Sequence, residues 1–328
     1  MDKSAARINL REDLDRVNDL MSRSLSTDID LLDRTNGTLL GRRGKQLRPT
    51  VALLTARACG HGACNEDTIR FAAASELLHN ATLLHDDVAD DSTERRGAPT
   101  VMSLLGSRAA VLLGDFWLVK AMGCVLDASV CDSARVIRIF SRTLSDLAEG
   151  EMLQLQKASS ADTTEEDYLR IIYGKTASLF VTAALSAAIS VGAAPAEEAA
   201  VRAYAGNLGI AFQIRDDIFD YEEDAVIGKP VGQDLHEQKI TLPLLGALRS
   251  VPGEEQRRIR NLVLGMTEHP GNQEEIVGFV RSSGGVAYAR RRLDEYVDKA
   301  VAALDGLPAG RDRDELAALA RFAGERTS

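Results

Sequence analysis

The sequence predicts an all-α protein, and three observations support that fold class. Apolar residues recur with the helical period along most of the 328 residues. Proline, which interrupts helices, occurs only eight times. Segments with the strict apolar–polar alternation of half-buried strands are scarce. Hydrophobic residues make up 45% of the chain, so a large helical core can form.

Helix-breaking segments rich in Gly, Pro, Asn and Ser mark the ends of the expected helices. In chain order they lie at 36–44, 59–65, 95–99, 158–164, 191–195, 228–234, 251–255 and 269–273. The segments between them have the length of long helices. The sequence TTEED at 163–167 marks one start, because a threonine cap precedes acids in the first turn. No linker or low-complexity run divides the chain, so we expect one domain over residues 1–328.

Composition limits the classes of partner. The formal net charge of −10 argues against nucleic acid, which binds to basic surfaces. We find neither the apolar core of a signal peptide nor a run of eighteen apolar residues, so we expect a cytoplasmic protein without an integral membrane segment. The cysteines are too few for a disulfide framework and are expected to be reduced thiols, rather than half of a metal site; they are Cys59, Cys64, Cys124 and Cys131.

The segment FAAASELLHNATLLHDDVADD at 71–91 is expected to form one helix with two different faces. Asp86 and Asp90 lie one turn apart on one face, and Asp87 lies beside them. His79 and Thr82 are on the same side, one to two turns earlier. The apolar stripe comprises Phe71, Ala74, Leu78, Ala81, Leu84 and Val88. The helix therefore has one packed face and one carboxylate face.

A second segment, FQIRDDIFDYEED at 212–224, repeats the D-D-x-x-D pattern 130 residues later. Asp216 and Asp220 share one helix face, with Asp217 beside them and Gln213 one turn back. The repetition predicts two equivalent acidic helices that face each other.

Paired carboxylates at this spacing favour a magnesium site. Mg²⁺ takes one or two protein carboxylates and completes its coordination with water and substrate phosphate. A solvated helix face is the simpler interpretation of an acidic run. However, like charges one turn apart destabilise a helix by a few tenths of a kcal/mol, and both runs are flanked by apolar residues. An EF-hand loop is a poor match, because neither segment has the required glycine.

Basic residues follow each acidic segment and also occur in two further motifs, GRRGKQLRP at 41–49 and YGKTASLF at 173–180. They are Lys45 and Arg48, Arg95 and Arg96, Lys175, Lys229 and Lys239. Taken singly, each is typical of a surface charge. Together they predict anion sites around a metal cluster, and a diphosphate bound to Mg²⁺ is the ligand that fits both charges.

With these motifs in place, the sequence resembles the trans-isoprenyl diphosphate synthases, most of all the long-chain members. Five motifs occur in the family's order: G-K-x-L-R-P at 44–49, D-D-x-x-D with R-R-G at 86–97, K-T at 175–176, F-Q-x-x-D-D-x-x-D at 212–220, and G-K-x-x-G-x-D-L with K-x-T-L-P at 228–243. The resemblance runs from about residue 40 to 245, and one such motif alone would be weak.

The resemblance implies a bundle of long antiparallel helices around a central cavity, usually a homodimer. It implies Mg²⁺-dependent head-to-tail condensation of isopentenyl diphosphate with an allylic diphosphate, giving an all-trans polyprenyl diphosphate. Asp86, Asp90 and Asp216 would bind metal, supported by Asp87, Asp217 and Asp220. Arg95, Lys175, Lys229 and Lys239 would bind the allylic diphosphate. Lys45, Arg48, His79 and Arg96 would bind isopentenyl diphosphate. Thr176 and Gln213 would face the reacting carbons, with Lys175 beside them.

Product length is expected to depend on the residues one turn before Asp86. Ala81 and Thr82 are small, whereas bulky aromatics there stop growth early in this family. The absence of bulky aromatic residues at these two positions favours a long product of the kind used as a quinone side chain. A deeper floor is possible within 114–122, where Phe116, Trp117, Leu118 and Met122 are candidates and Trp117 also fits an ordinary core position.

Other functions stay open at this point. A geranylgeranyl or farnesyl diphosphate synthase would need a large residue further along the tunnel. A non-catalytic subunit of a prenyl synthase would usually lack some of the aspartates or arginines that are present here. A terpene cyclase would replace the second aspartate motif, and a di-iron bundle would need a second Glu-x-x-His.

Overall fold

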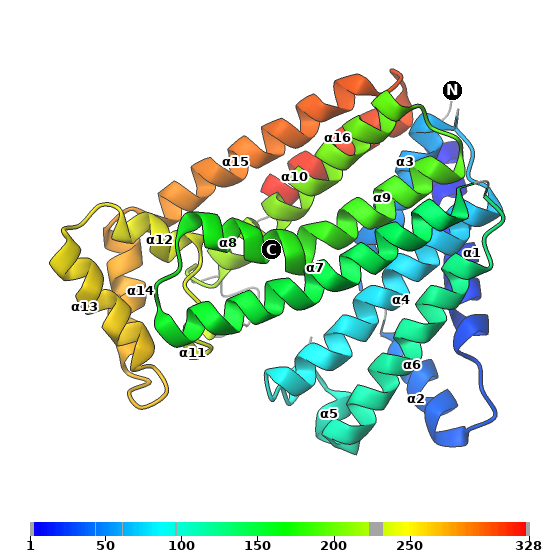
Figure 1. Cartoon of the computed structure of the whole chain (residues 1–328). Helices are drawn as coiled ribbons and strands as arrows, with labels where there is room; N and C mark the ends of the chain where they lie inside the picture. Colours follow the sequence, from blue (N-terminus) through cyan, green and yellow to red (C-terminus); the bar gives the residue numbers. More distant parts are fainter. Residues whose placement is uncertain are drawn as a thin grey trace. The chain divides into compact units, whose positions relative to one another are not determined.

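The computed structural model of the chain describes residues 3–42, 44–60, 62–95, 97–130, 132–222 and 232–325. Nearly all of this is helical, as predicted. The strands in the described residues are β1 (Glu94–Arg95) and β2 (Ala98–Pro99), which pair antiparallel as a short hairpin. Figure 1 shows the helices in chain order.

The chain packs as two compact units, each built from separate segments. The first comprises Met1–Arg142, Val181–Arg202 and Gly306–Leu316, and the second Thr143–Phe180, Ala203–Asp305 and Ala317–Ser328. The single domain expected from the sequence stays a prediction.

Helices of the first unit are α1 (Lys3–Leu25), α2 (Asp30–Gly41), α3 (Leu47–Cys59), α4 (Glu66–Ala89), α5 (Val101–Leu105) and α6 (Ser107–Leu126). Those of the second are α8 (Glu165–Ile172), the π-helix η1 (Tyr173–Ala177), α11 (Gln233–His236), α12 (Leu242–Leu248), α13 (Gly253–Leu264), α14 (Asn272–Ser282) and α15 (Gly285–Ala303). The elements that contribute to both units are α7 (Ser133–Ser160), α9 (Ser178–Ser190), α10 (Pro195–Phe219), the 3₁₀ turn η2 (Leu304–Gly306) and α16 (Arg311–Glu325).

Helix α4 is the central helix of the first unit. It packs along α6 and against α1 and α3, and Figure 1 shows α4 and α6 side by side. The predicted apolar stripe is buried from Phe71 to Leu84, but positions 71–78 are buried on all sides of the helix. The predicted packed face is therefore confirmed, and over 71–78 the other sides of the helix are packed as well, because α4 has neighbours all round.

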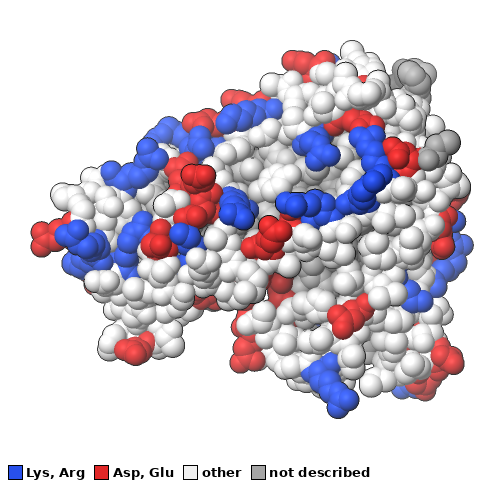
Figure 2. Space-filling view, in the orientation of Figure 1, with Lys and Arg blue, Asp and Glu red and all other residues white. Residues whose placement is uncertain are grey.

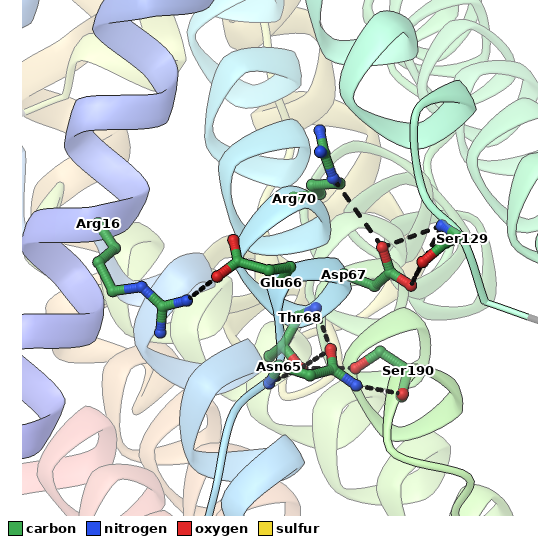
Figure 3. A network of polar contacts seen from close by, with 8 residues as sticks. All are labelled: Arg16, Asn65, Glu66, Asp67, Thr68, Arg70, Ser129 and Ser190. Carbon is green, nitrogen blue, oxygen red and sulfur yellow. Dashed lines mark hydrogen bonds and ion pairs between the residues drawn. The ribbon is translucent and has the colours of Figure 1, made fainter.

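The helix also starts earlier than predicted, at Glu66 instead of 71. Asn65 caps it, and its side chain accepts from the backbone N–H of Thr68 at 2.8 Å while Thr68 bonds back. Figure 3 shows how this end is held: Asn65 Nδ2 donates to the carbonyl of Ser190 at 2.6 Å, and Asp67 accepts from the backbone N–H of Ser129 at 3.1 Å. The start of α4 is thus bound to the end of α9 and to the segment before α7.

The core of the second unit is built around α12 and α15, which pack against each other. Apolar side chains from α8, α10, α13 and α14 complete it, including Tyr168, Ile214, Ile259 and Ile276. The predicted threonine cap at 163–167 is confirmed, since Thr164 accepts from the N–H of Asp167 at 3.1 Å. This cap starts α8, which runs straight into η1.

Among the residues that the structure describes, two helical stretches have the length and hydropathy of membrane spans. Within Glu165–Ser190, an 18-residue window has a mean hydropathy of 1.3 and is 83% buried, as expected of a core helix. Within Ser107–Leu126, which is α6, such a window has a mean hydropathy of 1.7 and is 39% buried. These values are weak evidence for a membrane span. The expectation that the chain has no integral membrane segment stays a prediction.

Candidate active site

The first acidic segment lies at the end of α4, and its aspartates differ in how deeply they are buried. Asp87 is buried and accepts a hydrogen bond from Nε of Arg95 at 2.7 Å. Asp86 is half-buried, and Asp90 is exposed. Asp90 is the C-cap residue, and its N–H donates to the carbonyl of Asp86 at 2.8 Å, so the two still lie one turn apart. The outer acids can take an external cation, whereas the middle acid holds the β1–β2 hairpin through Arg95.

The first predicted basic cluster lies at the start of α3. Lys45 is exposed and Arg48 is half-buried. Between them, Gln46 has a left-handed backbone with φ 48°, and its Nε2 donates to Oδ1 of Asn18 on α1 at 2.7 Å. This bond fixes the turn that carries both basic residues. Arg96, the fourth of the basic residues predicted in this half of the chain, lies outside the described residues.

His79 and the two predicted chain-length residues lie on α4. His79 is half-buried, and its carbonyl accepts from the hydroxyl of Thr82 at 2.8 Å. Thr82 is half-buried, whereas Ala81 is fully buried. Trp117 on α6 is a core residue: its Nε1 donates to Oδ1 of Asn36 at 2.8 Å. Thr82 therefore has more room than Ala81 for a larger side chain.

The second acidic segment ends α10 and repeats the same division. Asp216 is exposed, Asp220 is half-buried, and Asp217 is buried. Asp220 lies just past the helix, where its carboxylate accepts from the backbone N–H groups of Gln233 at 2.8 Å and Asp234 at 3.1 Å. Asp220 thereby holds the start of α11. In both segments the middle aspartate is the buried one.

Asp217 is bound on both sides within the second unit. Its Oδ2 accepts from the hydroxyl of Tyr168 at 2.6 Å, and its Oδ1 accepts from Nε2 of Gln213 at 2.8 Å. The amide oxygen of Gln213 in turn accepts from the hydroxyl of Thr176 at 2.7 Å. Burial raises the pKa of Asp217 to about 7, although the bonds from Tyr168 and Gln213 lower it. Sequence reasoning included three of these residues but missed Tyr168.

Lys175 and Thr176 lie in η1, a π-helical turn between α8 and α9. Such turns are rare and often mark functional sites. Lys175 pairs with Glu151 on α7, and its Nζ donates to Oε1 of Gln154 at 3.0 Å. Gly150 makes room for this approach, because a Cβ there would lie 3.1 Å from the backbone nitrogen of Lys175. Glu151 and Gln154 were missed, since a Glu and a Gln on an amphipathic helix give no distinctive signal.

Lys239 follows α11 and lies among acids. It pairs with Glu237, and its N–H donates to the carbonyl of Asp234 at 2.9 Å. Burial and then the charges of Asp217 and Asp220 raise the pKa of Asp234, while Lys239 lowers it. Lys229, the other predicted lysine of this region, lies outside the described residues.

The donor set of each acidic segment is compatible with Mg²⁺. Within the described ranges, no three His, Cys, Asp or Glu side chains converge as a protein-only metal site. Mg²⁺ does not require one, because it takes one or two carboxylates and keeps water or phosphate for the rest. The outer pairs, Asp86 with Asp90 and Asp216 with Asp220, fit that donor set. On the face drawn in Figure 2, positive and negative side chains lie interspersed.

Comparison with known proteins gives the family. The family model "Polyprenyl synthetase" matches residues 29–280. Octaprenyl diphosphate synthase of Escherichia coli K12 is 38% identical over 320 residues, covering 96% of both chains. An all-trans-nonaprenyl-diphosphate synthase of Rhodobacter capsulatus, described as geranyl-diphosphate specific, is 38% identical over 316 residues, covering 96% of this chain and 95% of its own. A polyprenyl synthase of Caulobacter crescentus, solved with calcium and isoprenyl diphosphate, superposes with a TM-score of 0.89 at 34% identity, covering 98% of this chain and 97% of its own. The chain therefore belongs to the polyprenyl synthetase family.

Proposed function

We propose that this chain condenses isopentenyl diphosphate head-to-tail with an allylic diphosphate and makes an all-trans, long-chain polyprenyl diphosphate. The observation that carries the proposal is the repeated acidic arrangement. In each segment the outer carboxylates are exposed or half-buried, and the middle one is buried against an internal partner. Family membership and the long products named for its relatives in Escherichia coli and Rhodobacter capsulatus support the same activity.

In this proposal, Asp86, Asp90 and Asp216 bind Mg²⁺. When bound, the metal supplies Lewis-acid stabilisation of the departing diphosphate. Arg95, Lys175, Lys229 and Lys239 bind the allylic diphosphate, and Lys45, Arg48, His79 and Arg96 bind isopentenyl diphosphate. The acidic partners of Arg95 and Lys175 fit such roles, because they hold each cationic side chain in place before an anion arrives.

Breaking the C–O bond releases diphosphate and leaves an allylic cation, which the double bond of isopentenyl diphosphate attacks to form the new C–C bond. The cation that results then loses a proton, for which the released diphosphate is the acceptor. Thr176 and Gln213 are proposed to face this cation. Their oxygen dipoles stabilise positive charge without forming a bond to it. Gln213 is half-buried and Thr176 is 8% exposed. Water therefore has little access to these side chains and competes weakly with the attacking double bond.

We also propose that the active form is a homodimer and that α6 contributes to its interface. Leu112, Val119 and Leu126 are exposed and recur every seven residues along α6. This is the spacing of a helix–helix seam. Val119→Glu is expected to shift the protein from dimer to monomer in light scattering. The same mass as wild type would exclude this face. A cytoplasmic location stays a prediction.

The experiment that tests the function uses purified protein with Mg²⁺, farnesyl diphosphate and labelled isopentenyl diphosphate. The expected result is a product ladder that ends beyond twenty carbons and disappears when EDTA is added. A ladder that stops at twenty would keep the chemistry but favour a geranylgeranyl synthase. No incorporation, although both substrates bind, would favour the non-catalytic subunit.

A further inference from the structure

Four side chains of the second unit form one continuous hydrogen-bonded row. Tyr168 donates to Asp217, Gln213 donates to the other oxygen of Asp217, and Thr176 donates to Gln213, all within 2.6–2.8 Å. Three of the four are buried: Tyr168 is 3%, Asp217 4% and Thr176 8% exposed. In a buried network of hydrogen-bonded side chains, no water can replace a lost partner. Each donor must therefore face an acceptor, which fixes the direction of every hydrogen bond.

The direction of the row follows from the chemistry of Asp217. In its ionised form Asp217 accepts hydrogen bonds and donates none, so the group of Gln213 that faces it is the NH₂. The amide oxygen of Gln213 then faces Thr176. A threonine hydroxyl has one proton, and this proton is used in the bond to Gln213. The hydroxyl oxygen of Thr176 therefore keeps its lone pairs for whatever else lies beside it.

We propose that Tyr168 and Asp217 are positioning residues that set this hydrogen-bond polarity, so that Thr176 presents an oxygen lone pair, and not a proton, to the allylic cation. This inference rests on the proposed function and extends it to two residues. Asp217 then acts through Gln213 and Thr176 and is not a metal ligand. Its burial and its two internal partners distinguish it from the exposed Asp216.

Tyr168 holds the carboxylate in the orientation that the row needs. Its hydroxyl engages Oδ2 and leaves Oδ1 directed at Gln213. The two residues come from α8 and α10, and Thr176 lies in η1, so the row also ties the π-helical turn to the second acidic segment. The π-helical turn follows α8 without a break, which keeps Tyr168 and Thr176 on one rigid element.

The test begins with Asp217→Asn. In this variant an amide NH₂ can face the NH₂ of Gln213, which turns the Gln213 amide round and makes Thr176 accept instead of donate. The hydroxyl proton then points away from Gln213. The expected result is a fall in kcat of about 100-fold, as for loss of one group that stabilises charge in a transition state, with KM for both substrates and the half-saturating Mg²⁺ concentration within about twofold of wild type. Tyr168→Phe is expected to lower kcat by about fivefold, as for one lost hydrogen bond.

A second background separates positioning from general structural damage. In Thr176→Val the hydroxyl is absent, so Asp217→Asn is expected to cause little further loss of kcat there. Thr176→Ser, which keeps the hydroxyl, is expected to retain the effect. Tyr221→Phe is the matched control: Tyr221 is buried in the same core, but its hydroxyl is not bonded to any of the four side chains, so normal kcat is expected.

Three results would overturn the inference. One is a raised Mg²⁺ requirement for Asp217→Asn, which would make Asp217 a metal ligand. Another is an equal loss of kcat in the Thr176→Val background, and the third is normal turnover of Tyr168→Phe. If Asp217→Asn does not fold, Tyr168→Phe can replace it: the loss of kcat that Tyr168→Phe causes in the wild type is compared with the loss that it causes in the Thr176→Val background. An inactive wild type would instead refute the proposed function.

Discussion

Asp87 and Asp90 lie three residues apart in one acidic segment, yet different effects are expected when each is replaced by alanine: a loss of stability at Asp87 and a loss of turnover at Asp90. Asp87→Ala removes the carboxylate that holds Arg95 at 2.7 Å. The Asp87 side chain is 6% exposed and that of Arg95 is 37% exposed, so the acid is buried while the arginine has access to water. Asp90 is exposed and is proposed to bind metal.

The expected loss of stability follows from that geometry. A hydrogen bond to a charged group contributes about 1.5–3 kcal/mol. Breaking a fully buried pair costs about 3–5 kcal/mol, but Arg95 can recover solvation. We therefore expect Asp87→Ala to lower the free energy of unfolding by about 1.5–3 kcal/mol. Asp90→Ala should change it by less than about 0.5 kcal/mol, as surface substitutions usually do.

Urea denaturation followed by circular dichroism measures stability, and incorporation of labelled isopentenyl diphosphate measures turnover. Asp90→Ala should lower turnover by two orders of magnitude or more at unchanged stability. Asp87→Ala should lose stability and a smaller share of its turnover at temperatures where it stays folded. If Asp90→Ala unfolds as easily as Asp87→Ala, or keeps near-normal turnover, the division into outer ligands and a middle support is wrong.

Three further predictions concern tunnel, packing and thiols. Thr82→Phe should shorten the longest product, measured by chromatography of the dephosphorylated alcohols; an unchanged ladder would place the tunnel elsewhere. Gly209→Ala should lower the free energy of unfolding by about 1–3 kcal/mol, because the added Cβ would lie 2.5 Å from the backbone of η1. Gly278→Ala has open space around the added Cβ and should raise the free energy of unfolding by up to about 1 kcal/mol. Equal effects of the two variants in thermal unfolding would contradict this. Burial raises the pKa of Cys59 and of Cys64 to about 12. Iodoacetamide at pH 8 should therefore alkylate both thiols about a thousandfold more slowly in the native than in the urea-unfolded protein. Fast labelling of the native protein, measured by mass spectrometry, would refute this expectation.

Local signals predicted much of the fold. Helical periodicity gave the fold class, and the Thr164 cap appeared where the acids of the first turn indicated it. The start of α4 was placed five residues late, although Asn65 and Thr68 form a capping box that could have marked it. The π-helical turn at Tyr173–Ala177 had no sequence signal, because its geometry depends on the close approach of its own Gly174 to Asp146 and Gly150 on α7.

The residues of the candidate site were predicted from the sequence, but their burial and their hydrogen-bond partners were not. The spacing of Asp86 and Asp90, and of Asp216 and Asp220, places pairs of carboxylates one turn apart in any helix. Spacing does not tell which aspartate of each segment is buried, since that depends on the neighbouring elements. Only the folded unit shows Asp217 between Tyr168 and Gln213.

The sequence by itself determined the helical class, the order of the acidic and basic motifs and the kind of ligand that they suit. These properties follow from residue type and from periods of a few positions along one chain. The tertiary structure decided which carboxylates are internal, which partners orient Lys175 and Thr176, and the direction of each hydrogen bond in the buried row. Those features depend on residues such as Tyr168 and Asp217, which are 49 positions apart and meet only when the helices pack.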